Sequence, residues 1–234
     1  MKVSEIRKQE FFNAAMELVK EKGYQKITVQ SVIDKLGVSK GAFYHYFNSK
    51  QDLLDIIIFH FVKNISKILE KIVEDEKLDA LEKLNKLIVT AKEYKAAQKE
   101  LNIEFIRQWR QGLISLNEPR IFKKYIKIIR PIWQKVIDQG VKEGIFNIPY
   151  PNEITDLIIH ISNYFNTSLA KLVIDIGKKP EFIKIIQRKV SLFEDVFERL
   201  LGVEKGSIDI IGPYMRNVTF YRKIIEENNL SKEI

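Results

Sequence analysis

The segment from Lys40 to Tyr46 combines a cation, small side chains and three rings that carry a polar atom. The Lys40 ammonium can donate hydrogen bonds to guanine O6 and N7, and the methyl group of Ala42 can contact a thymine methyl group. The hydroxyls of Tyr44 and Tyr46 lie at the ends of rigid arms and can reach phosphate oxygens, while His45 can contact a base or a phosphate. These residue types suit the surface of a nucleic acid.

Two short predicted helices and a tight turn place these side chains. Thr28 is a good N-cap for a helix that Gly37 closes, because glycine adopts the left-handed C-cap conformation without a steric penalty. Ser39 then caps a helix of about two turns, from Lys40 to Phe47. This is the pattern of a helix-turn-helix, whose second helix presents its first turn to base edges. Backbone N–H groups at helix starts also favour phosphates. The predicted DNA contacts are Thr28, Ser39, Lys40, Gly41, Ala42, Tyr44, His45, Tyr46 and Lys50.

The remaining chain gives helical patterns throughout, so the predicted fold class is all-α. We expect a three-helix, helix-turn-helix DNA-binding domain over 1–50, a linking helix over 49–75, and a larger helical domain over 51–234, to which the family resemblance given below assigns effector binding and dimerisation. Pro131 lies inside one helical pattern and should kink or break it. Beyond the linking helix, helices are predicted over roughly 79–96, 99–115, 119–143, 153–176, 180–201 and 214–228.

The composition limits the class of protein. Hydrophobic residues make up 45% and charged residues 30%, which is typical of a globular protein with a packed core. The formal net charge of +8 fits a polyanionic partner, and residues 1–50 supply half of that surplus. The start of the chain has no secretory signal pattern and no segment is apolar enough to span a bilayer, so we expect a cytoplasmic protein without a membrane partner.

Enzymatic and metal chemistry find little support in the residues. The chain has no cysteine, which excludes disulfides, thiol nucleophiles and cysteine-bound metals. It has no Gly-x-Gly and no His-Glu-x-x-His, and its three histidines, at 45, 60 and 160, are far apart in the sequence. We therefore expect no enzyme, no cofactor and no metal site.

The string LGVSKGAFYHYF over residues 36–47 carries a family resemblance, together with Thr28-Val29-x-x-Val32, Lys50 and Leu53-Leu54. It resembles the DNA-binding segment of the TetR family of bacterial transcriptional regulators, over about residues 8–60. Members of that family often carry histidine where this chain has Tyr46. The resemblance implies a homodimer that binds a palindromic operator of double-stranded DNA, with a pocket for a small-molecule effector in a variable helical C-terminal domain.

Large aromatic and polar side chains in the C-terminal part could line such a pocket, although a helical body also needs them for packing. His160 can lie on one helix face with Asp156 and Tyr164, either as a polar contact in a pocket or as a core or interface histidine. The candidate ligand-binding residues are Phe105, Trp109, Tyr125, Trp133, His160, Tyr164 and Phe165.

Two of the last helices, 153–176 and 180–201, carry apolar residues on more than one face, so a monomer would leave one face exposed to water. We therefore expect them to form the dimer interface. The candidate interface residues are Ile158, Ile161, Phe182, Ile186, Phe193 and Phe197.

These patterns favour a transcriptional regulator, a repressor that an effector releases from its operator. A second hypothesis is a helical small-molecule or lipid-binding protein whose DNA-binding module is unused. Salt-dependent binding to a palindrome upstream of its own gene distinguishes the two.

Overall fold

The computed structural model describes residues 3–22, 27–98, 119–174 and 181–227. Within these ranges the chain forms nine helices and no strand, which confirms the predicted all-α fold. The predicted helix over 99–115 lies outside the described residues. The other predicted helices are present, and their ends agree to within a few residues.

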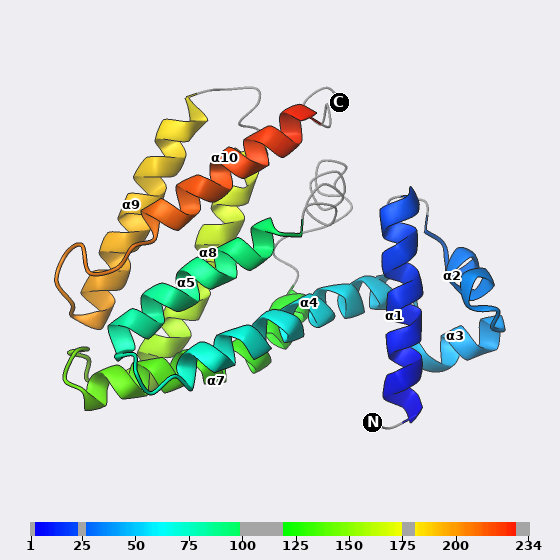
Figure 1. Ribbon diagram of the computed structural model, residues 1–234, viewed down its shortest axis with the longest axis horizontal. Helices are drawn as coiled ribbons and strands as arrows, with labels where there is room; N and C mark the ends of the chain where they lie inside the picture. Colours follow the sequence, from blue (N-terminus) through cyan, green and yellow to red (C-terminus); the bar gives the residue numbers. More distant parts are fainter. Residues whose placement is uncertain (1–2, 23–26, 99–118, 175–180, 228–234) are drawn as a thin grey trace.

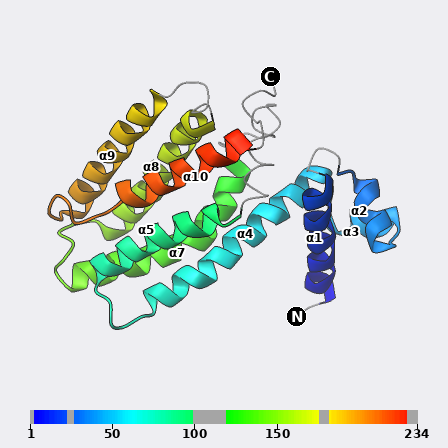
Figure 2. The same ribbon diagram turned by 45° about the horizontal axis from the view of Figure 1, so that its top comes forward.

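Three helices form a small unit at one end of the molecule, which we call the head: α1 (Val3–Lys22), α2 (Val29–Leu36) and α3 (Lys40–Tyr46). Figures 1 and 2 both show the head apart from the later helices. The head has a hydrophobic cluster of its own, in which Phe11, Val32 and Phe43 are at most 1% exposed. It can therefore keep its shape without contacts from the rest of the chain.

Local capping fixes the turn between α2 and α3. The Thr28 hydroxyl accepts a hydrogen bond from the Ser31 N–H, and the Ser31 hydroxyl accepts one from the Thr28 N–H, which makes a reciprocal capping box. Gly37 ends α2 with a φ of 64°, a left-handed value that other residues adopt only at a cost. The Ser39 hydroxyl then accepts from the Ala42 N–H and starts α3. Hydrogen bonds between residues close in sequence therefore determine where the two helices of the predicted helix-turn-helix begin and end.

The long helix α4 (Lys50–Val73) joins the head to the rest of the molecule. It starts beside the head and continues alongside α5 and α7 (Figures 1 and 2). Its second half buries Val62, Ile65 and Leu69 in a second hydrophobic cluster, formed with the later helices. We call the second half of α4 together with α5–α10 the body.

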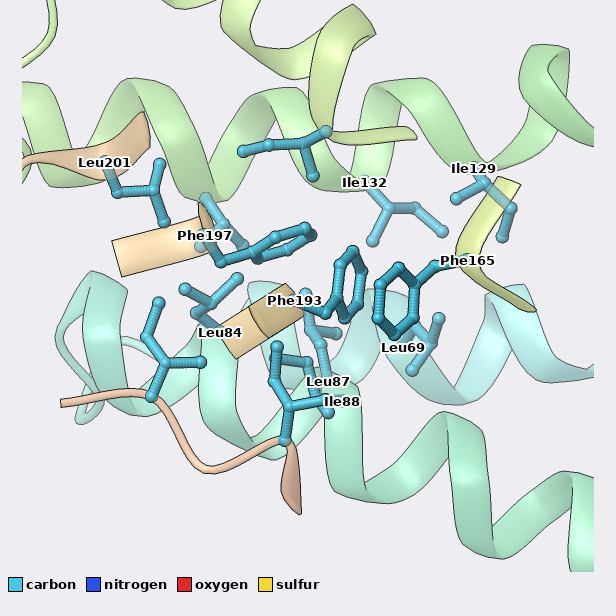
Figure 3. Packing of buried hydrophobic residues seen from close by; sticks show 14 of the residues in the cluster. Leu69, Leu84, Leu87, Ile88, Ile129, Ile132, Phe165, Phe193, Phe197 and Leu201 are labelled. Atoms are coloured by element: carbon cyan, nitrogen blue, oxygen red, sulfur yellow. The ribbon is translucent and has the colours of Figure 1, made fainter. Parts of the chain in front are cut away.

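The body contains five further described helices: α5 (Ala80–Ala96), α7 (Pro119–Lys142), α8 (Pro151–Ile174), α9 (Phe182–Leu201) and α10 (Ile211–Glu227). At its centre the rings of Phe165 and Phe193 stack with centres 4.1 Å apart, and Phe197 packs beside them (Figure 3). Stacked and tilted rings of this kind add to the free energy gained from burying their area.

The α7 helix runs unbroken through Pro131, where the sequence predicts a kink or a break. Pro131 and Lys127, one turn earlier, both lie on the exposed side of the helix. Water can therefore hydrogen-bond to the Lys127 carbonyl, which the proline leaves without its usual N–H partner.

Candidate nucleic-acid interface

Five consecutive aromatic residues, 43–47, divide between the interior and the surface of the head. Phe43 and Phe47 are 0% and 1% exposed, and their ring centres lie 5.7 Å and 5.2 Å from that of Phe11. Tyr44, by contrast, is 48% exposed. The two phenylalanines hold α3 against α1, and this anchoring turns the polar rings outward.

The outward side of α3 carries Lys40, Gly41, Tyr44 and His45, with Ala42 half-buried beside them. Tyr46 is also half-buried, and its ring lies edge-on to that of His45 at a centre distance of 4.8 Å. The structure therefore brings the predicted base and phosphate contacts onto one short helix, with their polar atoms near solvent.

The Lys40 ammonium makes no ion pair with any described residue. It lies 6.0 Å from the centre of the Tyr44 ring, at the outer limit of a cation–π contact. Lys35, five residues earlier, contrasts with it, because its ammonium lies 2.9 Å and 3.0 Å from carboxylate oxygens of Glu21 and Glu17. The hydrogen bond to Glu21, and then that to Glu17, raises the pKa of Lys35. Lys35 is thus neutralised within the head, whereas the charge of Lys40 remains available for a partner.

The two capping hydroxyls have a further use. Those of Thr28 and Ser39 accept backbone N–H groups at 3.0 Å and 3.2 Å. Neither O–H group donates to a described residue, so each can donate to a phosphate oxygen while it caps its helix.

Gly41 has no structural reason to be glycine. Its helix conformation is ordinary, and a Cβ added there would meet only the Ser39 hydroxyl oxygen, at 3.8 Å. Glycine in a helix costs stability relative to alanine, so the missing side chain suits the close approach of another molecule.

The start of α4 follows directly on α3. The Ser49 hydroxyl accepts from the Asp52 N–H at 3.2 Å, and the Asp52 carboxylate accepts from the Asn48 N–H at 2.8 Å. Lys50 is the first residue of α4, and its side chain lies outside the described part of the chain.

The predicted effector-binding residues do not form one group. Phe105 and Trp109 lie outside the described residues. Phe165 belongs to the central aromatic stack, and Trp133 packs edge-on against Phe197 with ring centres 6.2 Å apart. Burial raises the pKa of Tyr125, which packs against the same core, to about 12. These three positions therefore pack in or against the core of the body, and their role in ligand binding stays a prediction.

His160 and Tyr164 lie on the exposed side of α8 rather than in the interior, and Tyr164 is 69% exposed. The expected contact of His160 with Asp156 is absent, because the Asp156 carboxylate pairs with the Arg130 guanidinium at 2.5 Å. His160 instead lies edge-on to the Phe122 ring, with centres 5.2 Å apart. The exposed position of His160 excludes a core histidine, while an interface histidine stays a prediction.

Four of the six predicted dimer residues require a correction, and for the other two, Ile161 and Phe182, a place in the interface stays a prediction. Ile158 and Ile186 are 0% exposed, and Phe197 is 1% exposed within a single subunit. Phe193, at 8%, lies in the same core, while Ile161 and Phe182 are partly buried against it. The error has a simple cause: the apolar pattern of a helix does not reveal which face its own subunit covers. The exposed large apolar residues of these helices are Leu157, Tyr164, Ile185 and Leu192.

A spacing of seven could have identified these exposed residues. Leu157 and Tyr164 are seven apart in α8, and Ile185 and Leu192 are seven apart in α9, so each pair lies on one helix face.

Two properties of the described residues bear on other functions. None of their helices has the length and hydropathy needed to cross a membrane. No group of three or more acidic or histidine side chains in the described part could hold a metal ion.

Comparison with known proteins identifies related families in both parts of the chain. Residues 11–57 match the bacterial regulatory proteins of the tetR family, and residues 116–197 match the tetracyclin repressor-like C-terminal domain. The fatty acid metabolism regulator protein of Bacillus subtilis (strain 168) is 29% identical over 150 residues, which cover 62% of this chain and 76% of that protein. The HTH-type transcriptional repressor KstR2 of Rhodococcus jostii (strain RHA1) is 28% identical over 60% of this chain and 68% of its own length.

Solved structures show the same fold. A TetR transcription regulator from Haloarcula marismortui ATCC 43049 superposes with a TM-score of 0.54 at 20% identity, over 82% of this chain and 98% of that one. SmeT, the repressor of the Stenotrophomonas maltophilia multidrug efflux pump SmeDEF, gives a TM-score of 0.55 at 14% identity, over 86% and 93% of the two chains. With the helix-turn-helix and its outward polar side in place, the chain belongs to the TetR family of bacterial DNA-binding transcription regulators.

Proposed function

We propose that this regulator is a dimeric repressor that reads a palindromic operator with α3 and leaves it when an effector binds the body. The observation that carries the DNA contacts is the outward side of α3, where the Lys40 charge is not neutralised within the head and Gly41 leaves open space. Relatives whose names include repressor support the direction of regulation.

The proposed contacts follow from the chemistry of each side chain. Lys40 and Ala42, in the first turn of α3, contact base edges, and Gly41 lets the backbone approach. Tyr44 and Tyr46 donate to phosphates. The capping residues Thr28 and Ser39, together with Lys50 at the start of α4, bind phosphates as well, and His45 contacts a base or a phosphate.

The proposed dimer uses the exposed apolar side of α8 and α9. Leu192 is 58% exposed and Ile185 40%, an unfavourable arrangement for an isolated subunit. In the operator complex, two-fold-related reading helices require the two copies of α3 to lie about 34–36 Å apart, one turn of duplex. Leu192→Asp should give a monomer in sedimentation at micromolar concentration. Ile68→Asp, at a 38% exposed position on α4, is the matched control and should remain dimeric.

The proposed link between effector and DNA is α4, which starts at the head and is buried in the body. Suppose that an effector binds more tightly to the conformation in which the two heads are wrongly spaced for the operator. It then weakens operator binding in proportion to the difference between its affinities for the two conformations. A coupling of ~1–3 kcal/mol changes operator affinity by about 5- to 150-fold.

Fluorescence anisotropy with labelled DNA from upstream of the gene tests the DNA contacts. The wild-type protein should bind, and its affinity should fall steeply as salt rises, because phosphate contacts release counterions. Tyr44→Ala should weaken binding to all duplexes by a similar factor. Tyr150→Ala, at a 65% exposed tyrosine between α7 and α8, is the matched control and should bind as the wild type does. Equal binding by Tyr44→Ala would contradict the proposed interface.

A further inference from the structure

Lys92 lies where three helices of the body meet. Its ammonium donates to Asn166 Oδ1 on α8 at 3.0 Å and lies 4.3 Å from the centre of the Tyr214 ring on α10. The Asn217 side-chain amide, also on α10, donates to the Lys92 carbonyl oxygen at 3.1 Å. The residue is thus held from α5, α8 and α10 at once, and its position is well defined.

The charge of Lys92 has no counter-charge among the residues that the structure describes. No carboxylate of the described residues pairs with it, and its single hydrogen-bond acceptor among them is the neutral amide oxygen of Asn166. An ammonium has three N–H bonds, and removing it from water without a partner is unfavourable. Burial, and to a smaller extent the charge of Lys95, therefore lowers the pKa of Lys92 to about 7.

Lys83, on the same helix, shows what a structural lysine looks like in this body. Its ammonium donates to the Val73 carbonyl oxygen at 2.7 Å and to Gln139 Oε1 at 2.8 Å. The Val73 carbonyl lies at the C-terminal end of α4, where a helix favours a positive charge. These two oxygens tie α4, α5 and α7 together, so the position of Lys83 is explained without a ligand. No comparable set of acceptors among the described residues accounts for the position of Lys92.

The groups around Lys92 are suited to a carboxylate. Tyr214 is 9% exposed, and its hydroxyl hydrogen-bonds to no described residue. Burial raises the pKa of Tyr214, so this phenol stays neutral and can donate a hydrogen bond. The charge of Lys95, which lowers the pKa of Lys92, adds positive potential at the same place and also favours an anion. Phe165 and Val218, next in sequence to Asn166 and Asn217, belong to the apolar core of the body.

We propose that Lys92 binds the carboxylate of the effector, an apolar molecule that carries a single negative charge. The inference rests on the proposed function, since it assigns a ligand class to that effector. A carboxylate beside the ammonium stabilises its protonated form. The unliganded protein loses the Lys92 proton above about pH 7, but the complex retains it to higher pH. Affinity should therefore be constant below about pH 7 and fall as the pH rises above it.

Calorimetric titration with dodecanoate and with dodecan-1-ol tests this proposal, because the two probes share a chain and differ in charge. At pH 6.5 the wild type should bind dodecanoate at least about tenfold more tightly than the alcohol, the size of effect expected of a hydrogen bond to a charged group. Lys92→Met should lose this preference and keep its affinity for the alcohol. Lys86→Met is the matched control, since Lys86 is exposed on the same helix and pairs with no described residue. It should behave as the wild type.

The wild type alone provides a second measurement, which holds even if Lys92→Met fails to fold. Its dodecanoate affinity should fall by roughly tenfold between pH 6.5 and pH 8.5 through proton linkage, while its affinity for dodecan-1-ol stays constant. Absence of dodecanoate binding, equal affinity for both probes, or a preference kept in Lys92→Met would overturn the proposal. Operator binding by the same preparations separates the two claims: intact DNA binding without a carboxylate preference contradicts only the assignment of the effector.

Discussion

The outer side of the head and the interior of the body use the same residue types for different purposes. A Cβ added to Gly140 in α7 would lie 2.0 Å from a carbon of the Phe146 ring, so only glycine lets that buried ring pack against the helix. A Cβ at Gly41 would meet one atom, at 3.8 Å. The packing of the subunit itself requires glycine at position 140. At position 41 it does not, and the missing side chain there suits the approach of a binding partner.

The lysines show the same contrast. Lys83 in the body is 4% exposed and held by two oxygens, while Lys40 on the head is exposed and has no ion-pair partner among the described residues. A glycine or lysine that contributes nothing to the packing or hydrogen bonds of its own subunit indicates a binding surface. The residue type by itself does not. The predictions below test this division between internal and external roles.

The largest effect is expected for Phe43→Ala in the head. Phe43 is 0% exposed and contacts the Phe11 and Phe47 rings, so its truncation leaves a cavity. We expect a loss of about 3–5 kcal/mol in the free energy of unfolding, measured by chemical denaturation, together with loss of operator binding. Tyr44→Ala is the control from the adjacent position. It should retain stability and lose only DNA affinity, and a large destabilisation there would break the distinction between the two faces of α3.

Gly140→Ala should have the next largest effect, confined to the body. The new methyl group overlaps the Phe146 ring, which must move from a site where it is 2% exposed. We expect a cost of about 1–3 kcal/mol in the free energy of unfolding. Thermal or denaturant unfolding measures it, and a variant as stable as the wild type would show that Phe146 packs elsewhere.

Gly41→Ala should reverse that pattern. The methyl group has room within the head, and alanine is the better helix former by up to about 1 kcal/mol, so stability should be unchanged or slightly higher. DNA affinity should fall, because the methyl group stands between α3 and the groove. Anisotropy on the operator measures this loss, and unimpaired binding would remove Gly41 from the interface.

The smallest effect is expected at the junction of head and body, where the His60 ring on α4 stacks on Phe12 of α1 with centres 4.0 Å apart. Burial, and then the charges of Lys67 and Lys63, lower the pKa of His60 below its usual 6.5. The unfolded chain therefore binds a proton more readily, and stability should decline as the pH falls through about 6.5. Denaturation midpoints at pH 7.5 and 5.5 should differ less in His60→Gln than in the wild type. An equal pH dependence in both proteins would exclude His60 as its source.

The sequence predicted the head better than the body for a physical reason. Thr28, Gly37 and Ser39 act within a few residues of their own positions, so their types determine where α2 and α3 begin and end. The exposure of Tyr44 also followed from local geometry, since five consecutive rings cannot share one helix face.

The burial of body residues depends on helices that are distant in the sequence. Ile158 and Leu157 are adjacent and both apolar, yet the first is 0% and the second 43% exposed. Only the packing of α8 against α7, α9 and α10 decides between them. Lys92 was missed because its significance lies in the absence of a counter-charge among the described side chains of α8 and α10, which one helix pattern cannot reveal.

Selection of bound sites from random DNA by the purified wild-type protein and by Lys40→Ala tests most directly whether α3 reads DNA. The account predicts that the wild type enriches a palindrome whose half-sites are centred about one duplex turn, roughly 34–36 Å, apart. Lys40→Ala should enrich the same palindrome with relaxed preference at one position in each half-site. No enriched palindrome, or identical base preferences in the two proteins, would contradict the assignment of α3 and Lys40.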